Sequence, residues 1–143
     1  MKIMLLGSNG QVGSELKRKL SSLDEILAFS RDTLDITNYK AVEREIEIFE
    51  PNIVINAAAY TSVDKAETEV NQAYEVNFKA VSNLAYLAKT KKVWLLHYST
   101  DYVFDGRKYN SYIEADHCLP INIYGASKLS GEKAILKSQC NHL

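Results

Sequence analysis

The chain of 143 residues is long enough for one domain with a buried core, and its 46% hydrophobic and 24% charged residues are ordinary for a globular protein. A net charge of −1 gives no electrostatic basis for binding nucleic acid or an anionic membrane surface. Two cysteines, Cys118 and Cys140, stand in no metal-binding or redox spacing, and neither a signal peptide nor a membrane span is recognisable. Together these features predict a reduced, cytoplasmic protein.

The first element is an apolar run, IMLL at 3–6, that stops at the glycine-rich stretch GSNGQVG at 7–13. An apolar run bounded by glycine is typical of a strand buried on both faces of a parallel sheet. Val12, Leu16 and Leu20 then recur at helical spacing. A glycine turn between a strand and a helix offers backbone N–H groups and a positive helix end to a phosphate. An ordinary turn is the alternative, but the flanking strand and helix favour a pyrophosphate site.

The second predicted strand, EILAF at 25–29, ends at Ser30 and Arg31. In dinucleotide-binding folds an acidic residue at this point binds the adenosine ribose, whereas a nearby arginine accommodates a 2′-phosphate. Because no acid stands at Ser30 and an arginine follows at once, the sequence predicts a preference for NADPH, with NADH possible. The alternative for Arg31 is a solvated loop residue.

The middle of the chain predicts a helix ending at Pro51, a short strand at 53–55 and a longer helix at 66–90. Between the last two lies NAAAYTSVD at 56–64, whose small residues follow the end of the strand. That edge is where open α/β sheets bind ligands, although tight strand–helix packing would also use small residues. Asn77 interrupts the apolar side of the long helix, so it needs a partner in the backbone or in a ligand-binding loop.

The last third of the chain predicts a strand at 93–97, a polar loop at 105–120 of the kind that often covers substrates, and a helix at 121–137. Tyr124 and Lys128 are four residues apart in that helix, so their side chains share one face. An adjacent cation lowers a tyrosine pKa from about 10 toward neutrality, and such a tyrosine can exchange a proton with a carbonyl or alcohol oxygen. Thr100 can hydrogen-bond the same oxygen. A chance pair on an exposed helix face is the alternative for the tyrosine and lysine alone.

Repeated strand–helix alternation predicts an α/β fold with a doubly wound parallel sheet, Rossmann-like. The glycine turn, Thr100, Tyr124 and Lys128 in this order resemble the extended short-chain dehydrogenase/reductase superfamily. The motifs GSNGQVG, NAAAYTSVDKAE, HYSTDYVFDG and NIYGASKLSGE narrow the resemblance to the dTDP-4-dehydrorhamnose reductase family over nearly the whole chain. Three histidines, His97, His117 and His142, are spread out in the sequence, and no metal site is expected.

The resemblance implies reduction of the C4 ketone of a dTDP-sugar to dTDP-L-rhamnose, with a hydride from NADPH. Tyr124 would protonate the oxygen, Lys128 would hold the ribose and tune Tyr124, and Thr100 would orient the ketone. The implied cofactor-binding residues are Gly7, Asn9, Gly10, Gln11, Val12, Ser30, Arg31, Asp35, Ile36, Ala57, Ala58, Ala59, Tyr60, Thr61, Asn77, Ser99, Tyr124 and Lys128. The implied substrate-binding residues are Val63, Thr100, Asp101 and Tyr102.

Members of this family are roughly twice as long, so residues 1–143 are expected to form the NADP-binding domain, ending after the fourth or fifth strand–helix unit, without a substrate domain and as an inactive or incomplete fragment. An unpaired edge on the fourth strand would then favour self-association through that edge or through a terminal helix. Two alternatives stay open. One is a non-catalytic NADP-binding regulatory module, and the other is a different nucleotide-sugar epimerase or dehydratase of the same superfamily.

Overall fold

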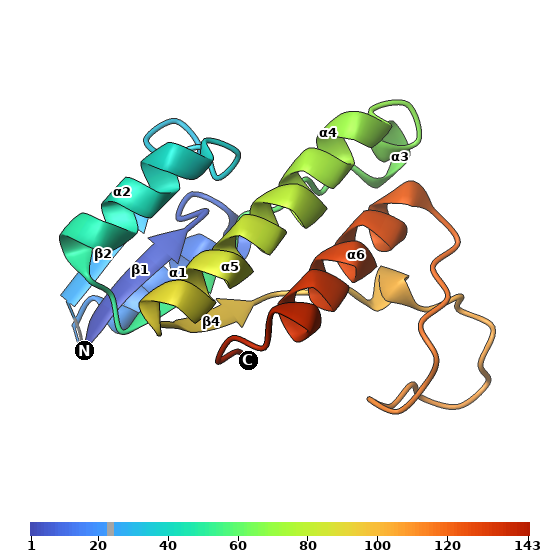
Figure 1. The fold of residues 1–143 in the computed structure, drawn as a ribbon. Helices are drawn as coiled ribbons and strands as arrows, with labels where there is room; N and C mark the ends of the chain where they lie inside the picture. Colours follow the sequence, from blue (N-terminus) through green and yellow to red (C-terminus); the bar gives the residue numbers. More distant parts are fainter. Residues whose placement is uncertain (23–24) are drawn as a thin grey trace.

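The computed structural model describes residues 1–22 and 25–143, which form a parallel sheet with helices on both faces (Figure 1). The strands are β1 (Lys2–Leu6), β2 (Glu25–Phe29), β3 (Ile53–Asn56) and β4 (Trp94–His97). Their order is β2-β1-β3-β4, and every pair is parallel. The chain therefore moves outward in one direction from β1 to β2 and in the other direction from β3 to β4. This confirms the predicted doubly wound α/β fold, and it places the crossover between β1 and β3.

Alternate residues of the strands pack on opposite faces of the sheet. Met4 and Leu6 join the larger core beneath α2 and α5, whereas Ile3 and Leu5 join a smaller core that contacts α1. Figure 1 shows α2, α5 and α6 on one side of the sheet and α1 on the other. The helices are α1 (Gln11–Leu20), α2 (Tyr39–Phe49), α3 (Val63–Ala66), α4 (Val70–Tyr74), the π-helix η1 (Glu75–Ala80), α5 (Val81–Lys91), the 3₁₀ turn η2 (Asp101–Val103) and α6 (Ile123–Ser138).

The prediction of one regular helix at 66–90 is wrong in two respects. The short helix α3 ends at Ala66, and the following helix starts only at Val70. This second helix then passes through the π-helical segment η1 before α5. The wider π-turn adds about one residue to the helix, which changes the direction of every side chain beyond it. Within this helix Asn77 is buried against the segment after β3, and Val76 lines a cleft while it also packs against the larger core.

Helix α6 packs closely because two glycines lie where other chain segments approach it. A Cβ atom at Gly125 would stand 2.1 Å from the carbonyl oxygen of Tyr102 in η2. A Cβ atom at Gly131 would stand 2.3 Å from the carbonyl oxygen of Asn77 in η1. Asn122 begins the helix by accepting a hydrogen bond from the backbone N–H of Gly125 at 2.7 Å. These contacts fix the height and rotation of α6 against η1 and η2.

The edge of β4 is paired, which corrects the prediction that this edge is open. Leu95 N–H donates to the carbonyl of Asn141, and Leu143 N–H donates to the carbonyl of Leu95. The N–H of His97 donates to the carbonyl of Leu143. Residues 141–143 thus lie along β4 in the parallel direction, as the next strand of the sheet would. Strand pairing at this edge is therefore not an available route to self-association for Leu95 and His97.

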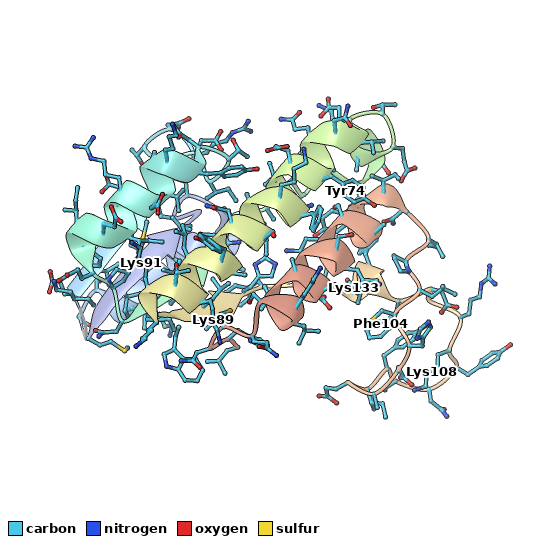
Figure 2. The ribbon with its side chains drawn as sticks, in the orientation of Figure 1. Tyr74, Lys89, Lys91, Phe104, Lys108 and Lys133 are labelled. Atoms are coloured by element: carbon cyan, nitrogen blue, oxygen red, sulfur yellow. The ribbon has the colours of Figure 1, made fainter. Side chains whose placement is uncertain are left out.

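Within residues 1–22 and 25–143, none of the helices combines the length and the apolar character needed to cross a bilayer. The predicted polar loop at 105–120 lacks helices and strands, as expected. It projects to one side of α6, and Phe104 and Lys108 lie in this projecting part of the molecule (Figure 2). Its own side chains hold it: the Phe104 and Tyr112 rings stack at 4.3 Å, and Lys108 pairs with Asp116.

Candidate functional site

A cleft of about 780 Å³ opens at the carboxyl ends of β1 and β3, where the strand order reverses. This is the position at which open α/β sheets bind ligands. The predicted residues that line it are Gly7, Asn9, Gly10, Gln11, Val12, Arg31, Asp35, Ile36, Ala57, Ala58, Ala59, Tyr60 and Thr61. The structure therefore brings the glycine turn, the end of β2 and the small residues after β3 together around one space.

Glycine stands at the three positions of the turn for different structural reasons. Gly7 has a φ of +82°, and a Cβ there would stand 2.6 Å from the backbone nitrogen of Ala58. A Cβ at Gly13 would stand 2.1 Å from the carbonyl oxygen of Gly7, so α1 sits directly on the turn. Gly10 has an ordinary φ of −73°, and the nearest atom to an added Cβ is the Gly7 oxygen at 3.4 Å.

Gly10 is thus a glycine that the protein fold itself hardly needs. It stands at the start of α1, a ten-residue helix, and lines the cleft. A side chain here would project into space that a phosphate could use, beside backbone N–H groups and the positive end of the helix. The residues present therefore fit the pyrophosphate of a dinucleotide.

The far wall of the cleft carries a loosely paired arginine. Arg31 Nε lies 3.8 Å from Asp35 Oδ2, and the two side chains are 74% and 42% exposed. Thr37 donates two hydrogen bonds to Asp35, from its backbone N–H at 2.9 Å and from its hydroxyl at 2.8 Å. The backbone bond from Thr37 is the largest cause that lowers the pKa of Asp35 below its usual value. The carboxylate is thereby held in place, and the guanidinium stays free to turn toward a ligand.

Five of the predicted cofactor residues do not line this cleft: Ser30, Asn77, Ser99, Tyr124 and Lys128. Ser30 is buried, and its carbonyl accepts from the N–H groups of Thr33 and Leu34, so it shapes the turn that carries Arg31. The hydroxyl of Ser99 donates to Glu132 on α6.

Asn77 holds the cleft wall through Tyr60. Its Oδ1 accepts from the backbone N–H of Tyr60 at 2.9 Å, and its Nδ2 donates to the Tyr60 carbonyl at 3.0 Å. The same Nδ2 also donates to the hydroxyl of Ser127 on α6 at 3.0 Å. A side chain with all of these bonds acts on a ligand indirectly, because it fixes the loop that would touch the ligand. The sequence predicted a partner for Asn77 either in the backbone or in a ligand-binding loop. Both alternatives hold, because the backbone groups that Asn77 binds belong to Tyr60 in the loop at the cleft.

The predicted catalytic side chains gather where β4, η2 and α6 meet. Lys128 is 2% exposed, and its Nζ donates to the carbonyl oxygen of Tyr98 at 2.6 Å. Burial lowers the pKa of Lys128 to about 8. Tyr124 is 9% exposed and meets the ring of Tyr102 edge-on at 5.5 Å. Thr100 begins η2, and its Oγ1 accepts from the backbone N–H of Tyr102 at 3.3 Å. Strand end and helix face thus place the tyrosine, the lysine and the threonine in one region.

The predicted substrate residues divide between two environments. Asp101 and Tyr102 are exposed on η2, next to Thr100. Val63 instead begins α3 and packs with Tyr60 against the cluster formed by Ala66, Ala73 and Tyr124. Val63 can therefore help to position Tyr124 and Tyr60 through packing.

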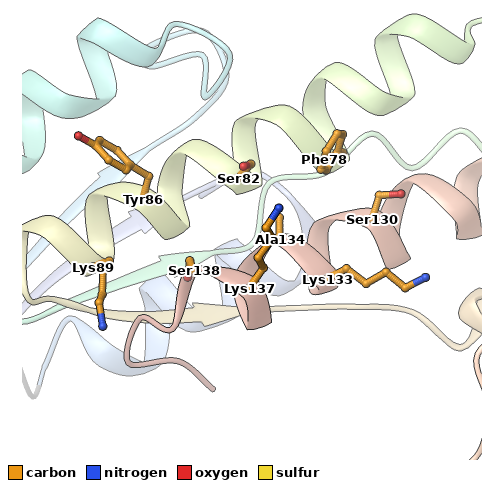
Figure 3. Close-up of a pocket in the computed structure, with 9 residues that line it drawn as sticks. All are labelled: Phe78, Ser82, Tyr86, Lys89, Ser130, Lys133, Ala134, Lys137 and Ser138. Carbon is orange, nitrogen blue, oxygen red and sulfur yellow. The ribbon is translucent and has the colours of Figure 1, made fainter.

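Sequence reasoning missed two cleft residues, Leu34 and Val76. Leu34 follows Arg31 in the turn after β2, and an apolar residue there gives no signal that separates it from the core. Val76 lies in the π-helical segment η1, where it lines the cleft and also packs against the larger core. A second hollow of about 610 Å³ lies between α5 and α6 (Figure 3). Lys89, Lys133 and Lys137 surround it, and none of the predicted site residues lines it.

Fold and site together define a doubly wound α/β domain of the extended short-chain dehydrogenase/reductase type. The family described as RmlD substrate binding domain matches residues 1–143, so the chain belongs to this family. A dTDP-4-dehydrorhamnose reductase from Burkholderia thailandensis is 47% identical over 138 residues, which are 96% of this chain and 46% of that protein. The reductase of Escherichia coli K12 is 41% identical over 147 residues, which are 100% of this chain and 49% of that protein.

The same relationship holds for solved structures. A dTDP-4-dehydrorhamnose reductase from Bacillus anthracis, in complex with NADP, superposes with a TM-score of 0.95 at 37% identity and covers 99% of this chain and 50% of its own. The ortholog from Clostridium acetobutylicum gives a TM-score of 0.95 at 38% identity, with 99% and 51% covered. The chain thus spans about half the length of the curated relatives it matches.

Proposed function

We propose that residues 1–143 form the NADP-binding domain of a dTDP-4-dehydrorhamnose reductase, which reduces the C4 ketone of dTDP-4-dehydro-L-rhamnose. The observation that carries the proposal is the cleft at the β1/β3 crossover, where Gly10 leaves open space at the start of α1. The relatives at 37–47% identity, one of them solved with NADP, support the same substrate and cofactor. The domain assignment of residues 1–143 belongs to this proposal.

In this function NADPH supplies the hydride, and the chain's own residues handle the oxygen of the ketone. Tyr124 donates a proton to that oxygen, and Thr100 orients it through its hydroxyl. The Oγ1 of Thr100 accepts from Tyr102 N–H and donates to Oδ1 of Asp101 at 3.3 Å, so the hydroxyl would turn away from Asp101 to donate to a ligand. Lys128 holds ribose hydroxyls beside Tyr124, and Asp101 and Tyr102 contact the sugar. The cleft walls at Arg31 and Ala57–Tyr60 would hold the adenosine and nicotinamide halves of the cofactor.

The test is a calorimetric titration of the 143-residue chain, first with NADPH and then with NADH. We expect saturable binding of both, tighter for NADPH because Arg31 can pair with the 2′-phosphate. Circular dichroism on the same sample establishes that the chain is folded. A folded chain that binds neither dinucleotide would overturn the proposal, and a chain that prefers NADH would overturn the role of Arg31.

Two further expectations go with this function. The protein would act in the cytoplasm, where NADPH and nucleotide sugars are available. It would also self-associate, through a terminal helix or through the outer edge of β2, which pairs on one side only among the described strands. Sedimentation at several concentrations tests the second expectation, since a monomer mass that does not change with concentration would contradict it.

A further inference from the structure

One face of helix α6 holds the segment that follows β4. Tyr124, Lys128 and Glu132 are four residues apart in α6, so their side chains lie one turn apart on the same face. The ring of Tyr124 meets the ring of Tyr102 edge-on at 5.5 Å. One turn further along, Nζ of Lys128 donates to the carbonyl oxygen of Tyr98 at 2.6 Å. The segment therefore runs along α6 in the direction opposite to the helix.

Glu132 adds a third contact on this face, next to Thr100. The hydroxyl of Ser99 donates to the carboxylate of Glu132. Ser99 stands between Tyr98, which Lys128 holds, and Thr100, which begins η2. Two consecutive residues before Thr100 are thus anchored to α6 by side chains from consecutive turns of that helix. The position of Thr100 relative to α6 follows from these two anchors.

Glu132 is also an acidic neighbour of Lys128. Lys128 is 2% exposed, and burying a charge is costly unless an opposite charge or hydrogen bonds compensate. Burial lowers the pKa of Lys128 to about 8, and the charge of Glu132 opposes this shift, so the lysine is mostly an ammonium at pH 7. Along the helix axis Glu132 is roughly 6 Å from Lys128 and roughly 12 Å from Tyr124, so its charge acts mainly on the lysine.

We propose that Glu132 is a positioning residue for the proposed reaction. It fixes Ser99, and through Ser99 the neighbouring Thr100. It is also the counter-charge of the buried Lys128 and keeps this side chain an ammonium. The catalytic meaning of the inference rests on the proposed function, because Thr100 and Lys128 receive their roles there, whereas the contacts of Glu132 do not depend on it.

A charged Lys128 matters for Tyr124, one helical turn away. A cation beside a tyrosine favours the phenolate, so it makes the phenol a stronger acid toward a ketone oxygen. An ammonium also offers three donors to ribose hydroxyls. One carboxylate would thus serve two parts of the reaction, the orientation of the ketone through Thr100 and the acidity of the tyrosine through Lys128.

The elements packed against α6 contribute several other groups. They are His97 from β4, Asp101 and Tyr102 from η2, Cys118 from the 105–120 loop, Glu67 from the turn after α3, Lys89 from α5, and the uncharged Asn77 and Ala73 from η1 and α4. Burial, followed by the charge of Lys128, lowers the pKa of His97 to about 3, so this ring is neutral at pH 7. Burial, followed by the charge of Glu132, raises the pKa of the Cys118 thiol, which is therefore neutral as well. The acid among these neighbours whose charge raises the pKa of Lys128 is Glu132.

Nuclear magnetic resonance of the labelled 143-residue chain tests the contacts without any substitution. When the pH is lowered, the carboxyl carbon of Glu132 titrates, and the signals of Ser99 and of the Lys128 side chain should shift with the same midpoint. In the alkaline range Nζ of Lys128 should titrate at about pH 8, below Lys133, an exposed lysine on the same helix. Signals of Ser99 and Lys128 that do not follow Glu132 would overturn the proposal.

The variant Glu132→Gln isolates the charge. Glutamine keeps an oxygen that can accept from Ser99, so only the negative charge is lost. We expect the Lys128 midpoint to fall below its wild-type value while the signals of Thr100 stay in place. Glu15→Gln is the matched control, because it removes one exposed negative charge from α1, on the other side of the sheet (Figure 1). An unchanged Lys128 midpoint in a folded Glu132→Gln chain contradicts the counter-charge role.

The variant Ser99→Ala isolates the hydrogen bond and should give the reverse pattern. The signals of Thr100 should shift, and the N–H of Tyr102, which Thr100 Oγ1 accepts at 3.3 Å, should exchange with solvent faster. The Lys128 midpoint should stay close to the wild-type value, and Ser99→Thr, which keeps a hydroxyl, should restore the signals of Thr100. A residue that only stabilised the fold would not produce two opposite patterns. Unchanged Thr100 signals in Ser99→Ala refute the positioning of Thr100.

The dinucleotide titration keeps this inference apart from the proposed function. If Ser99 and Lys128 follow Glu132 as expected but neither NADPH nor NADH binds, the contacts of Glu132 stand and the proposed function fails. If NADPH binds and Lys128 is indifferent to Glu132, the function stands and the inference fails. The wild-type titration needs no substitution, so it remains decisive even where a variant does not fold.

Discussion

The predicted site residues lie in two regions, the cleft and the junction of β4 with α6, which differ in how far their side chains are already buried and hydrogen-bonded within the protein. At the cleft, Gly10 has open space beside it and Arg31 is 74% exposed on its side chain. At the junction of β4 and α6, Lys128 is 2% exposed and bonded to the backbone of Tyr98, and Gly125 is closed by Tyr102. The first region is arranged around a space, and the second is arranged around internal contacts.

This difference predicts whether a substitution changes ligand affinity or the stability of the fold. At Gly10 and Arg31 in the cleft, a changed residue meets solvent or ligand, so it should alter affinity while the fold stays intact. At the β4–α6 junction, the same change removes or crowds an internal contact, so it should alter stability and its dependence on pH. Four measurements test this division, and they differ in the size of the effect expected.

The largest effect should come from His97 in acid. Its pKa is about 3 in the folded protein against 6.5 for an ordinary histidine, so the unfolded chain binds more protons between these values. Stability therefore falls as the pH falls from 6.5 toward 3, by about 5 kcal/mol in total. Urea unfolding at pH 7 and pH 4.5 should show that His97→Leu escapes this loss. His117→Leu, at an exposed position, is the control, and identical pH profiles for all three proteins would refute the expectation.

The next largest effect should appear when glycine is replaced by alanine in each of the two regions. Gly125→Ala places a methyl group 2.1 Å from the Tyr102 carbonyl, so we expect a loss of about 2–3 kcal/mol in the free energy of unfolding. Gly10→Ala meets its nearest atom at 3.4 Å and should cost only about 0.5–1 kcal/mol, because alanine is a poorer residue than glycine at the start of α1. Thermal and urea unfolding of the two variants measure the contrast. Equal losses would mean that the cleft is as tightly packed as α6.

A third measurement asks whether the open space at Gly10 belongs to a phosphate. Gly10→Val fills that space, and we expect the affinity for NADPH to fall at least about a hundredfold, which corresponds to about 2.7 kcal/mol. Calorimetry on the folded variant gives the value. Gly106→Ala is the control for glycine replacement in a remote loop: its φ of +72° strains an alanine, but the added methyl group meets nothing within 4 Å among the described residues, so the affinity for NADPH should not change. Unchanged affinity in Gly10→Val would show that the glycine turn has a structural role only.

The smallest effect concerns the choice between the two dinucleotides. Arg31→Ala should weaken NADPH by about tenfold, or about 1.4 kcal/mol, and leave NADH nearly unchanged. The guanidinium is exposed and its contact with Asp35 is long at 3.8 Å, so the fold should tolerate the change. Lys133→Ala, at an exposed position on α6, is the matched control for loss of one positive charge. Equal weakening of both dinucleotides would place Arg31 near a phosphate that they share.

The parts of the fold with a local signal could be predicted from the sequence. The apolar runs located the strands, and the glycine turn located the start of α1. The spacing of Tyr124 and Lys128 placed both on α6, which spans Ile123–Ser138 against a predicted 121–137. These features depend on residues close together in the chain, where periodicity and capping act.

What escaped prediction depends on residues far apart in the chain. The glycines at 125 and 131 look like ordinary helix residues until η2 and η1 approach them. The contacts of His97 could not be predicted, because they come from Asn56 on another strand and from Lys128 on α6. The pairing of residues 141–143 with β4 likewise needs the sheet to exist first. No sequence window of one element contains this information.

The π-helical segment η1 has a consequence for insertions and deletions. Successive residues of an α-helix are rotated by about 100°, so one residue more or less turns everything beyond it by that angle. η1 absorbs such an extra residue at Glu75–Ala80. Deleting one residue there would restore a regular helix, but Asn77 and the apolar side of α5 could no longer face their partners together. A length change of a single residue in this helix would therefore be more disruptive than longer insertions in the 105–120 loop.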